Sequence, residues 1–569
     1  MVDKILTDQP LAPSSEGETP VPLSISDGLP NSTSQSDGRT SAPPSSGSDP
    51  VIPTWRLVVL GISLSVGLFL SLMDATIVAT ALFQIGEDFK QLTSVTWVAL
   101  AYTLAYVGCA VLFTRISDVI GRRNAYTAAN AIFIAFSIGC GLAKNLNQLI
   151  ACRAVQGIGG SGLYSLTMVI FPEITPLRLR PSIGAVVGLI IAVAGVLGPV
   201  VGGLITHYST WPWIFFINAP VGILPAIALH FVWPTASQMY PAKRRSIKEI
   251  DFIGCVLLLA ATVLVVFAFQ QGGLGSTNQI WHSALFIAPL VVGCICWIAL
   301  IGWETVVQRL LSIPPLLPIN LLRQRVYLSG VLCTITTGYV YFTLIYTLPI
   351  HIQIVNQKSA LLAGIDLLPM LGSAAVGSMA GGYLNAKKNN IFPIMLFGAS
   401  LMAIGSGLFS TVDGLTLEPK VYGYQVLIGL GFGLAVSNAT MLAIIESGLD
   451  EHAVAQGVVA QARVLGGSIG IAASTAILGA TQRREIASAH QSAATGSAVQ
   501  TLAVRQAYAD AFQRTMQVAA VIACVTVVLT VGTWQRHPLT MAERAKQLHI
   551  EKAKLARAQL AGRGGVEKC

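Results

Sequence analysis

The sequence predicts an all-α polytopic membrane protein with fourteen transmembrane helices. Three observations support this prediction: long apolar runs, a low content of charge, and an uneven distribution of Lys and Arg among the loops. Charged residues make up 11% of the chain, against about 25% in an average soluble protein. Each run approaches or exceeds the ~20 residues that a helix needs to cross ~30 Å of hydrocarbon, where its backbone must satisfy its own hydrogen bonds. The predicted spans are 57–82, 95–114, 125–143, 149–170, 183–205, 213–233, 252–270, 284–301, 327–348, 361–383, 391–411, 421–445, 458–480 and 516–534.

The loops set the orientation of these spans. With the N-terminus inside, most Lys and Arg fall on the cytoplasmic side, so both termini are predicted to be cytoplasmic. Residues 1–55, rich in Ser, Pro, Thr and Gly, are expected to form a disordered tail. Residues 535–569 form a basic tail, in which 541–560 is either a helix on the anionic leaflet or a solvated charged segment. The positive charge is dispersed among loops, so the lipid bilayer is a predicted partner and nucleic acid is not.

No cofactor or metal site is predicted. Residues 157–162 match the pattern GxGxxG, but they lie inside an apolar run and not after a strand, so we expect close helix packing there. The chain has no GxxxxGK[S/T] sequence, which excludes a P-loop ATP site in this polypeptide. Cys294 and Cys296 would point to different faces of a helix and have no His or Cys cluster nearby. No catalytic spacing of His, Cys or carboxylates occurs, so an enzyme is not expected.

Two charges stand out within the first and fourth spans. Asp74 and Arg153 are both predicted to lie in the outer third of the membrane, at comparable depth. A charge in the hydrocarbon region is costly and usually functional. An ion pair between the two would break when Asp74 takes up a proton, which would couple protons to a conformational change. The alternatives are a fixed structural pair, or an Asp near an aqueous vestibule.

The cytoplasmic loop after the second span is a candidate gating latch. Gly121 permits a tight turn, and Asp118, near a helix C-terminus where the dipole disfavours an anion, is expected to pair with Arg122. Arg123 completes the motif. The alternative is that these basic residues only set the topology.

The fifth span contains a candidate hinge. Pro199 removes a backbone donor and kinks the helix, while the glycines beside it allow a neighbouring helix to slide or tilt. The alternative is simple close packing. The glycines of this motif are Gly195, Gly198, Gly202 and Gly203.

Together these segments resemble the major facilitator superfamily, in its fourteen-spanner drug:proton antiporter branch, and more narrowly the toxin and multidrug efflux pumps of filamentous fungi. The sequence departs from the usual motifs at Phe83, where a proline is typical, at Thr114, where a glycine is typical, and at Pro212, where an arginine is typical. The resemblance covers residues 56–534 and is carried by 73–78 with Ala81 and Leu82, 118–123, 153–157, 198–203, 211–222, and 346–353 with 363–369.

The resemblance implies a major facilitator fold, with a six-helix half at 56–233, two inserted helices in 234–326 and a second half at 327–534. It implies that spans one, four, nine and twelve line a central cavity, which brings Asp74 to Arg153 and adds Asn438. Gln156 joins these residues because it belongs to the fourth-span motif. The implied energy source is a proton gradient, and a monomer is expected.

The leading hypothesis is therefore proton-coupled export of a small amphipathic organic molecule, a fungal secondary metabolite or a xenobiotic, across the plasma membrane, with a vacuolar or vesicle membrane left open. Tyr102, Tyr106 and Tyr164 would suit a partly apolar ligand, although ordinary helix packing explains them equally well. Uptake of a nutrient or an iron-siderophore complex is the second hypothesis, and a membrane sensor that does not transport is the third.

Overall fold

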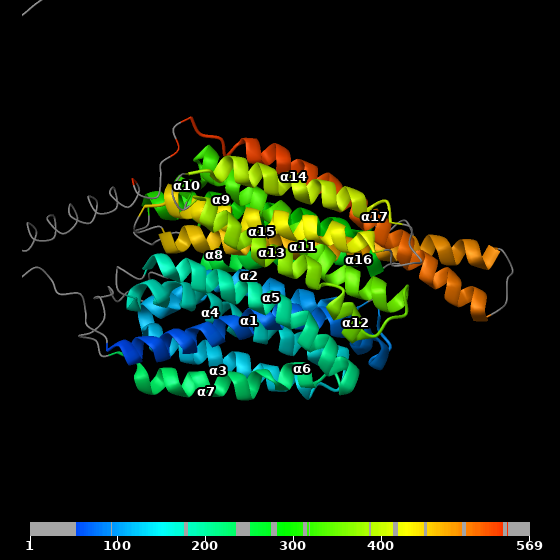
Figure 1. Cartoon of the computed structure of the whole chain (residues 1–569), viewed down its shortest axis with the longest axis horizontal. Helices are drawn as coiled ribbons and strands as arrows, with labels where there is room; N and C mark the ends of the chain where they lie inside the picture. Colours follow the sequence, from blue (N-terminus) through cyan, green and yellow to red (C-terminus); the bar gives the residue numbers. More distant parts are fainter. Residues whose placement is uncertain are drawn as a thin grey trace, which may run out of the picture. The chain divides into compact units, whose positions relative to one another are not determined.

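The computed structural model describes a helical chain, with no strand among its described residues (Figure 1). The described residues do not include 1–52 or most of the C-tail, in which only Glu543 of the segment 541–560 is described. The predictions for the two tails therefore remain predictions. The described residues are 53–92, 94–175, 180–234, 251–274, 282–310, 316–317, 319–385, 389–412, 419–448, 452–491, 497–536, 538 and 543.

Every predicted span falls on a helix or on a broken pair of helices. The sixth span is interrupted at Ile217 and the tenth at Asp366 and Leu367. The first bundle contains α1 (Thr54–Asp88), α2 (Trp97–Ile120), α3 (Arg122–Gly141), α4 (Leu146–Ile174), α5 (Arg180–Tyr208), α6 (Trp213–Phe216) and α7 (Asn218–Val232). Then follow α8 (Phe252–Leu274), α9 (Ala284–Leu310) and α10 (Ile319–Leu322). The second bundle contains α11 (Arg325–Ile354), α12 (Ala360–Ile365), α13 (Leu368–Asn385), α14 (Ile391–Phe409), α15 (Lys420–Glu446), α16 (His452–Gln491) and α17 (Ser497–Val531).

The number of membrane-crossing helices is smaller than predicted. Among the described residues, 11 helices are long and apolar enough to cross, or 12 if α2, bent by 49°, counts as one span. Helix α3, which carries Arg122, Arg123 and Asn124 in its first turn, is not in this set. In α5 only Val193–Tyr208 qualifies, as a shorter apolar helix. The predicted count of fourteen is therefore not confirmed.

The same packing order occurs in both bundles. Helix α1 packs against α4, α5 and α7, and α4 also packs against α2 and α3. In the second bundle α11 packs against α15, α16 and α17, and α15 packs against α13 and α14. The bundles meet where α5 contacts α12 and α13, α16 contacts α2, and α1 contacts α11. The domain limits given above stay a prediction.

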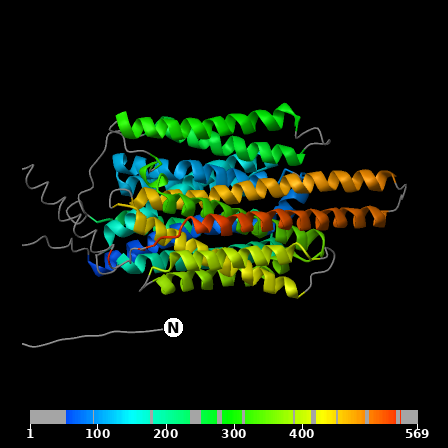
Figure 2. The same ribbon diagram turned by 90° about the horizontal axis from the view of Figure 1, so that it is seen from above.

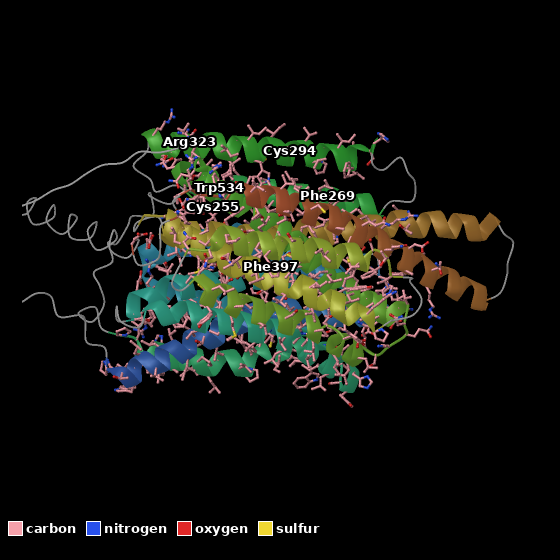
Figure 3. All side chains as sticks on the ribbon, turned by 45° about the horizontal axis from the view of Figure 1, so that its top comes forward. Cys255, Phe269, Cys294, Arg323, Phe397 and Trp534 are labelled. Atoms are coloured by element: carbon pink, nitrogen blue, oxygen red, sulfur yellow. The ribbon has the colours of Figure 1, made fainter. Side chains whose placement is uncertain are left out.

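Helices α8 and α9 lie together along one side, shown in green in Figure 2. Of the two, α8 contacts both α2 and α16, so the pair covers one of the two seams between the bundles. Cys294, on α9, is exposed at the edge of the bundle (Figure 3).

Glycines bring the helices of each bundle into close contact. A methyl group at Gly159 of α4 would lie 2.8 Å from the backbone oxygen of Ala129 on α3. In α15, a methyl group at Gly433 would lie 2.6 Å from the backbone nitrogen of Ser378 on α13. Both distances are far below van der Waals contact, so only glycine fits. The run 157–162 therefore lies in a helix-packing contact, as expected from its place in an apolar helix.

Candidate functional site

Asp74 of α1 and Arg153 of α4 form an ion pair inside the first bundle, and both side chains are 0% exposed. Arg153 Nη1 donates to Asp74 Oδ2, and Arg153 Nε donates to the Val98 backbone oxygen at 3.1 Å. The guanidinium carbon also lies 4.2 Å from the centre of the Tyr102 ring, in cation–π geometry. The structure thus gives the buried cation an anion, a carbonyl and an aromatic face.

Two amides complete the coordination of the Asp74 carboxylate. Asp74 Oδ1 accepts hydrogen bonds from Gln156 Nε2 at 3.0 Å and from Asn218 Nδ2 at 2.9 Å. Both amides also donate to Ser137 Oγ, at 2.7 Å and 2.8 Å. The network joins α1, α3, α4 and α7, so Asp74 connects four helices of one bundle.

This arrangement supplies the buried Asp74 carboxylate with hydrogen-bond donors and a counter-charge. Three donors, one of them a cation, converge on a carboxylate that water does not reach. Removing one partner of a buried pair usually costs about 3–5 kcal/mol, because it leaves an uncompensated charge. Protonation of Asp74 would remove the anion and weaken every one of these contacts together.

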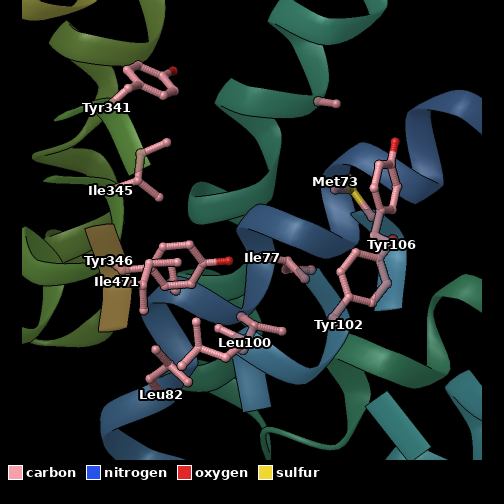
Figure 4. Close-up of a cluster of buried hydrophobic side chains, with 14 of the residues drawn as sticks. Met73, Ile77, Leu82, Leu100, Tyr102, Tyr106, Tyr341, Ile345, Tyr346 and Ile471 are labelled. Carbon is pink, nitrogen blue, oxygen red and sulfur yellow. The ribbon is translucent and has the colours of Figure 1, made fainter. Parts of the chain in front are cut away.

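The same stretch of α1 connects Asp74 to the second bundle. Tyr346 of α11 donates to the backbone oxygen of Ala75, the residue after Asp74. Gln353 Nε2 donates to the Thr80 backbone oxygen at 3.2 Å. Figure 4 shows the Tyr346 ring extending toward Ile77 of α1 among buried side chains. The acid and two contacts between the bundles therefore lie within two helical turns.

The motif in α5 packs against both α1 and α12. Methyl groups at Gly198 and Gly202 would collide with Thr76 and with Ile77 of α1. A methyl group at Gly203 would lie 2.6 Å from the Ala360 backbone oxygen of α12.

Pro199 lies inside α5, and its backbone oxygen accepts a hydrogen bond from Thr80 Oγ1 at 3.3 Å. A methyl group at Gly195 would have no neighbouring atom within 4 Å. Close packing thus accounts for Gly198, Gly202 and Gly203, and a hinge at Pro199 remains a prediction.

The candidate latch clamps three helices. Arg122 Nη1 lies 2.6 Å from Asp118 Oδ1, and Arg122 Nη2 lies 3.0 Å from Glu173 Oε1 at the end of α4. Gly121 has φ of 92°, which favours glycine, and a methyl group on it would meet no atom within 4 Å. Backbone conformation and not crowding therefore requires glycine there. Within the described part of the chain, Arg123 forms no ion pair.

The three candidate tyrosines and Asn438 lie in different parts of the structure. Tyr102, Tyr106 and Tyr164 form a row, with ring centres 6.0 Å and 5.8 Å apart. Asn438 of α15 is buried in the second bundle, where its Oδ1 accepts from Asn385 Nδ2 at 2.6 Å and its Nδ2 donates to the Leu434 backbone oxygen at 2.7 Å. Its hydrogen bonds are therefore to its own bundle and not to Asp74.

Sequence reasoning missed three residues of chemical interest. Asn218 lies within the motif at 211–222, but the sequence indicated no role for it. Glu173 lies just beyond the predicted end of the fourth span. Arg463 lies inside the predicted span 458–480, and the signal that could have found it is the one that identified Asp74, a charge within an apolar run. Among the described residues, no group of three His, Cys, Asp or Glu side chains is placed to hold a metal.

Comparisons with known proteins place these features in a family. Residues 64–471 match the model of the Major Facilitator Superfamily. The chain is 33% identical over 436 residues to the MFS-type transporter FPY5 of Fusarium mangiferae, covering 74% of this chain and 72% of that one. It is 30% identical over 426 residues to the efflux pump roqT of Penicillium rubens, covering 74% and 77%.

Solved structures agree in fold. A bacterial homolog of the human lysosomal transporter Spinster, in an inward-facing, unoccupied conformation, superposes with a TM-score of 0.58 at 15% identity, covering 86% of this chain and 100% of that one. An auto-inhibited POT family peptide transporter also gives 0.58, at 12% identity, covering 84% and 98%. The matched family model and the relatives confirm the resemblance inferred from the motifs. The chain therefore belongs to the major facilitator superfamily and is a multi-pass membrane transporter, not an enzyme.

Proposed function

We propose that this transporter exports a small amphipathic organic molecule from the cytoplasm in exchange for protons, by alternating access in the plasma membrane. The observation that carries this proposal is the fully buried Asp74, held by Arg153, Gln156 and Asn218. An ionisable group at this depth is usually functional. A carboxylate also loses its negative charge when it takes up one proton, so proton binding at Asp74 would remove the anion of the pair.

The first step of the proposed cycle is proton uptake by Asp74. While ionised, the carboxylate holds α1 against α4 and α7. Once protonated, it no longer attracts the Arg153 guanidinium, and α1 loses its strongest connection within the first bundle. Release of the proton on the other side restores the pair.

The second step is a movement of α1 relative to its neighbours. Thr76 Oγ1 donates to the Ala194 backbone oxygen at 3.4 Å, and Thr80 Oγ1 donates to that of Pro199 at 3.3 Å. Helix α1 is therefore hydrogen-bonded to α5 two and six residues beyond Asp74. Tyr346 and Gln353 join the same turns to α11. A shift of α1 therefore acts directly on the contact between the bundles.

The third part of the proposed cycle is opening and closure of the protein on the two sides of the membrane. Ala75 and Thr80 lie 21 and 26 residues after the start of α1 at Thr54, which is ~30–40 Å along the helix and thus toward the outer face. The contact of Gly203 with α12 is also near the outer end of α5. Closure at these points and its loss after protonation would expose the interior alternately to the two sides.

Export is favoured over uptake by the names of the relatives, which include efflux pumps. The row of Tyr102, Tyr106 and Tyr164 offers aromatic surface for a partly apolar molecule.

The test is efflux of a panel of fluorescent amphipathic compounds from cells that produce the protein, with and without a proton uncoupler. We expect wild-type efflux to stop with the uncoupler and Asp74→Asn to lack it. The matched control is Asp510→Asn, since within the described part of the chain Asp510 Oδ1 accepts only a local hydrogen bond from Gln506 of the same helix, at 3.3 Å. Uncoupler-sensitive efflux that survives Asp74→Asn would show that coupling lies elsewhere, and efflux insensitive to the uncoupler would contradict proton drive.

A further inference from the structure

Arg463 is a second arginine within the membrane region, and it differs from Arg153 in its surroundings. It lies 11 residues after the start of α16 at His452, which is ~17 Å along the helix. An arginine at this depth normally faces the protein interior or a water-filled cavity and pairs with another group.

Protein groups leave Arg463 without the usual partners. Among the described residues, its buried Nε has no hydrogen-bond partner and no carboxylate lies within 4.0 Å of its side chain. Arg153, by contrast, is bonded to Asp74, Gln156 and the Val98 backbone oxygen.

The position of Arg463 is at the seam between the two bundles. On the same helix, Gln461 Nε2 donates to the Val107 backbone oxygen of α2 at 3.0 Å, and Ser468 Oγ donates to Thr103 Oγ1 at 3.0 Å. Tyr106 of α2 lies in the sequence between Thr103 and Val107, the two residues that accept these hydrogen bonds. The Arg463 residue is half-buried, so solvent reaches part of it.

Helices of both bundles that contact α16 carry aromatic side chains. Tyr106 and Tyr164 lie with ring centres 5.8 Å apart on α2 and α4. From the second bundle, Tyr341 of α11 stacks on Phe432 of α15, with ring centres 3.6 Å apart and ring planes at 1°. Figure 4 shows Tyr106 and Tyr341 on the two opposing sets of helices.

We propose that Arg463 binds the acidic group of the transported molecule, and that the substrate is an aromatic or otherwise apolar organic anion whose ring system lies against Tyr106 and Tyr164. A half-buried guanidinium without a carboxylate partner gains a charge-assisted, bidentate contact when an oxyanion binds. The proposal rests on the proposed function, since it names the chemical class of the exported molecule.

Binding of matched acid and ester pairs tests this inference. The purified protein is placed in nanodiscs of phosphatidylcholine, which carry no net charge, and protein-free discs provide the blank. The probes are tritiated naphthaleneacetate, anthraceneacetate and pyrenebutyrate, each with its methyl ester. We expect the wild-type protein to bind at least one acid about tenfold more tightly than its ester, since a charge-assisted hydrogen bond is worth about that factor.

Variants then assign the preference to Arg463. Arg463→Gln is expected to lower affinity for the acid by about tenfold and to leave affinity for the ester unchanged, while Arg463→Lys keeps part of the preference. Ser468→Ala, on the same helix, is the control and is expected to keep the preference. Equal binding of acid and ester, no binding of any pair, unchanged acid binding in Arg463→Gln, or equal weakening of both probes would each overturn the proposal.

Two further outcomes separate this inference from the proposed function. A preference for the acid that depends on Arg463, without any gradient-driven transport, would contradict proton-coupled export and leave the anion site standing. Proton-driven transport of esters with no preference for acids would contradict the anion site and leave export standing. A final outcome concerns lipid. If phosphatidylglycerol replaces part of the phosphatidylcholine, suppresses the preference for the acid and is itself preferred over the acid, then Arg463 binds lipid phosphate. That result would also overturn the proposal.

Discussion

Replacing the partners of the buried ion pair should destabilise the protein in a non-additive way. Arg153→Gln leaves the Asp74 carboxylate with the two amides of Gln156 and Asn218 but no cation, and Asp74→Asn leaves the Arg153 guanidinium without an anion. Both side chains are 0% exposed, so water does not compensate for the loss. Each single variant is therefore expected to lose about 3–5 kcal/mol of stability.

The double variant should lose much less than the sum of the two single variants. With Asn at position 74 and Gln at position 153, no uncompensated charge is buried, so the coupling energy between the two sites should exceed about 1 kcal/mol. Thermal unfolding in detergent, followed by a thiol-reactive dye, measures this difference. Cys140 suits the assay because it is a buried free cysteine whose Sγ lies 3.4 Å from Gln156 Oε1.

Additive losses in that cycle would refute the reasoning, because they would mean that the two charges do not depend on each other. The control is Asp510→Asn, which removes an acid outside the network and should change the unfolding temperature little. Export should remain absent in the double variant even where stability is restored, since a neutral pair has no proton to exchange.

Three other predictions follow from the contacts described above. Asn218→Leu removes a 2.9 Å donor to Asp74 and should cost about 1.5–3 kcal/mol in unfolding assays; a change below about 0.5 kcal/mol would contradict its place in the network. Arg122→Gln should change the rate of transport in vesicles because it breaks the contact of α3 with α2 and α4, whereas Arg123→Gln should not; equal effects would argue against the latch. Gly203→Val should weaken closure at the outer side because the contact with α12 leaves no room, whereas Gly195→Val should be tolerated, and accessibility of an engineered outer cysteine to a thiol reagent distinguishes the two.

The positions of the helices could be predicted from sequence because hydrocarbon requires long apolar helices, and each predicted span lies on one helix or on a broken pair. The breaks at Ile217 and at Asp366 were not predicted, because one polar residue in each run, Asn218 or Asp366, does not lower the hydropathy enough to divide the span. The pairing of Asp74 with Arg153 was predictable because a buried charge needs a partner at its own depth. Asn218 was not, because an amide at a helix start carries no periodic signal.

The ends of helices explain two further differences. Helix α4 continues to Ile174, beyond the predicted end at 170, and this places Glu173 beside Arg122. Helix α16 begins at His452, six residues before the predicted span. Arg463 therefore lies 11 residues after the start of its helix, further from the helix end than the predicted span placed it. Asn438 was grouped with Asp74 by family resemblance alone, and its hydrogen bonds lie with Asn385 and Leu434.

The central claim is that protons drive transport through Asp74, and gradient-driven accumulation in proteoliposomes tests it most directly. An imposed pH gradient should concentrate substrate with the wild-type protein, while Asp74→Asn should still exchange labelled for unlabelled substrate but fail to concentrate it. Accumulation by Asp74→Asn as steep as that of the wild-type protein, under the same gradient, would contradict the account.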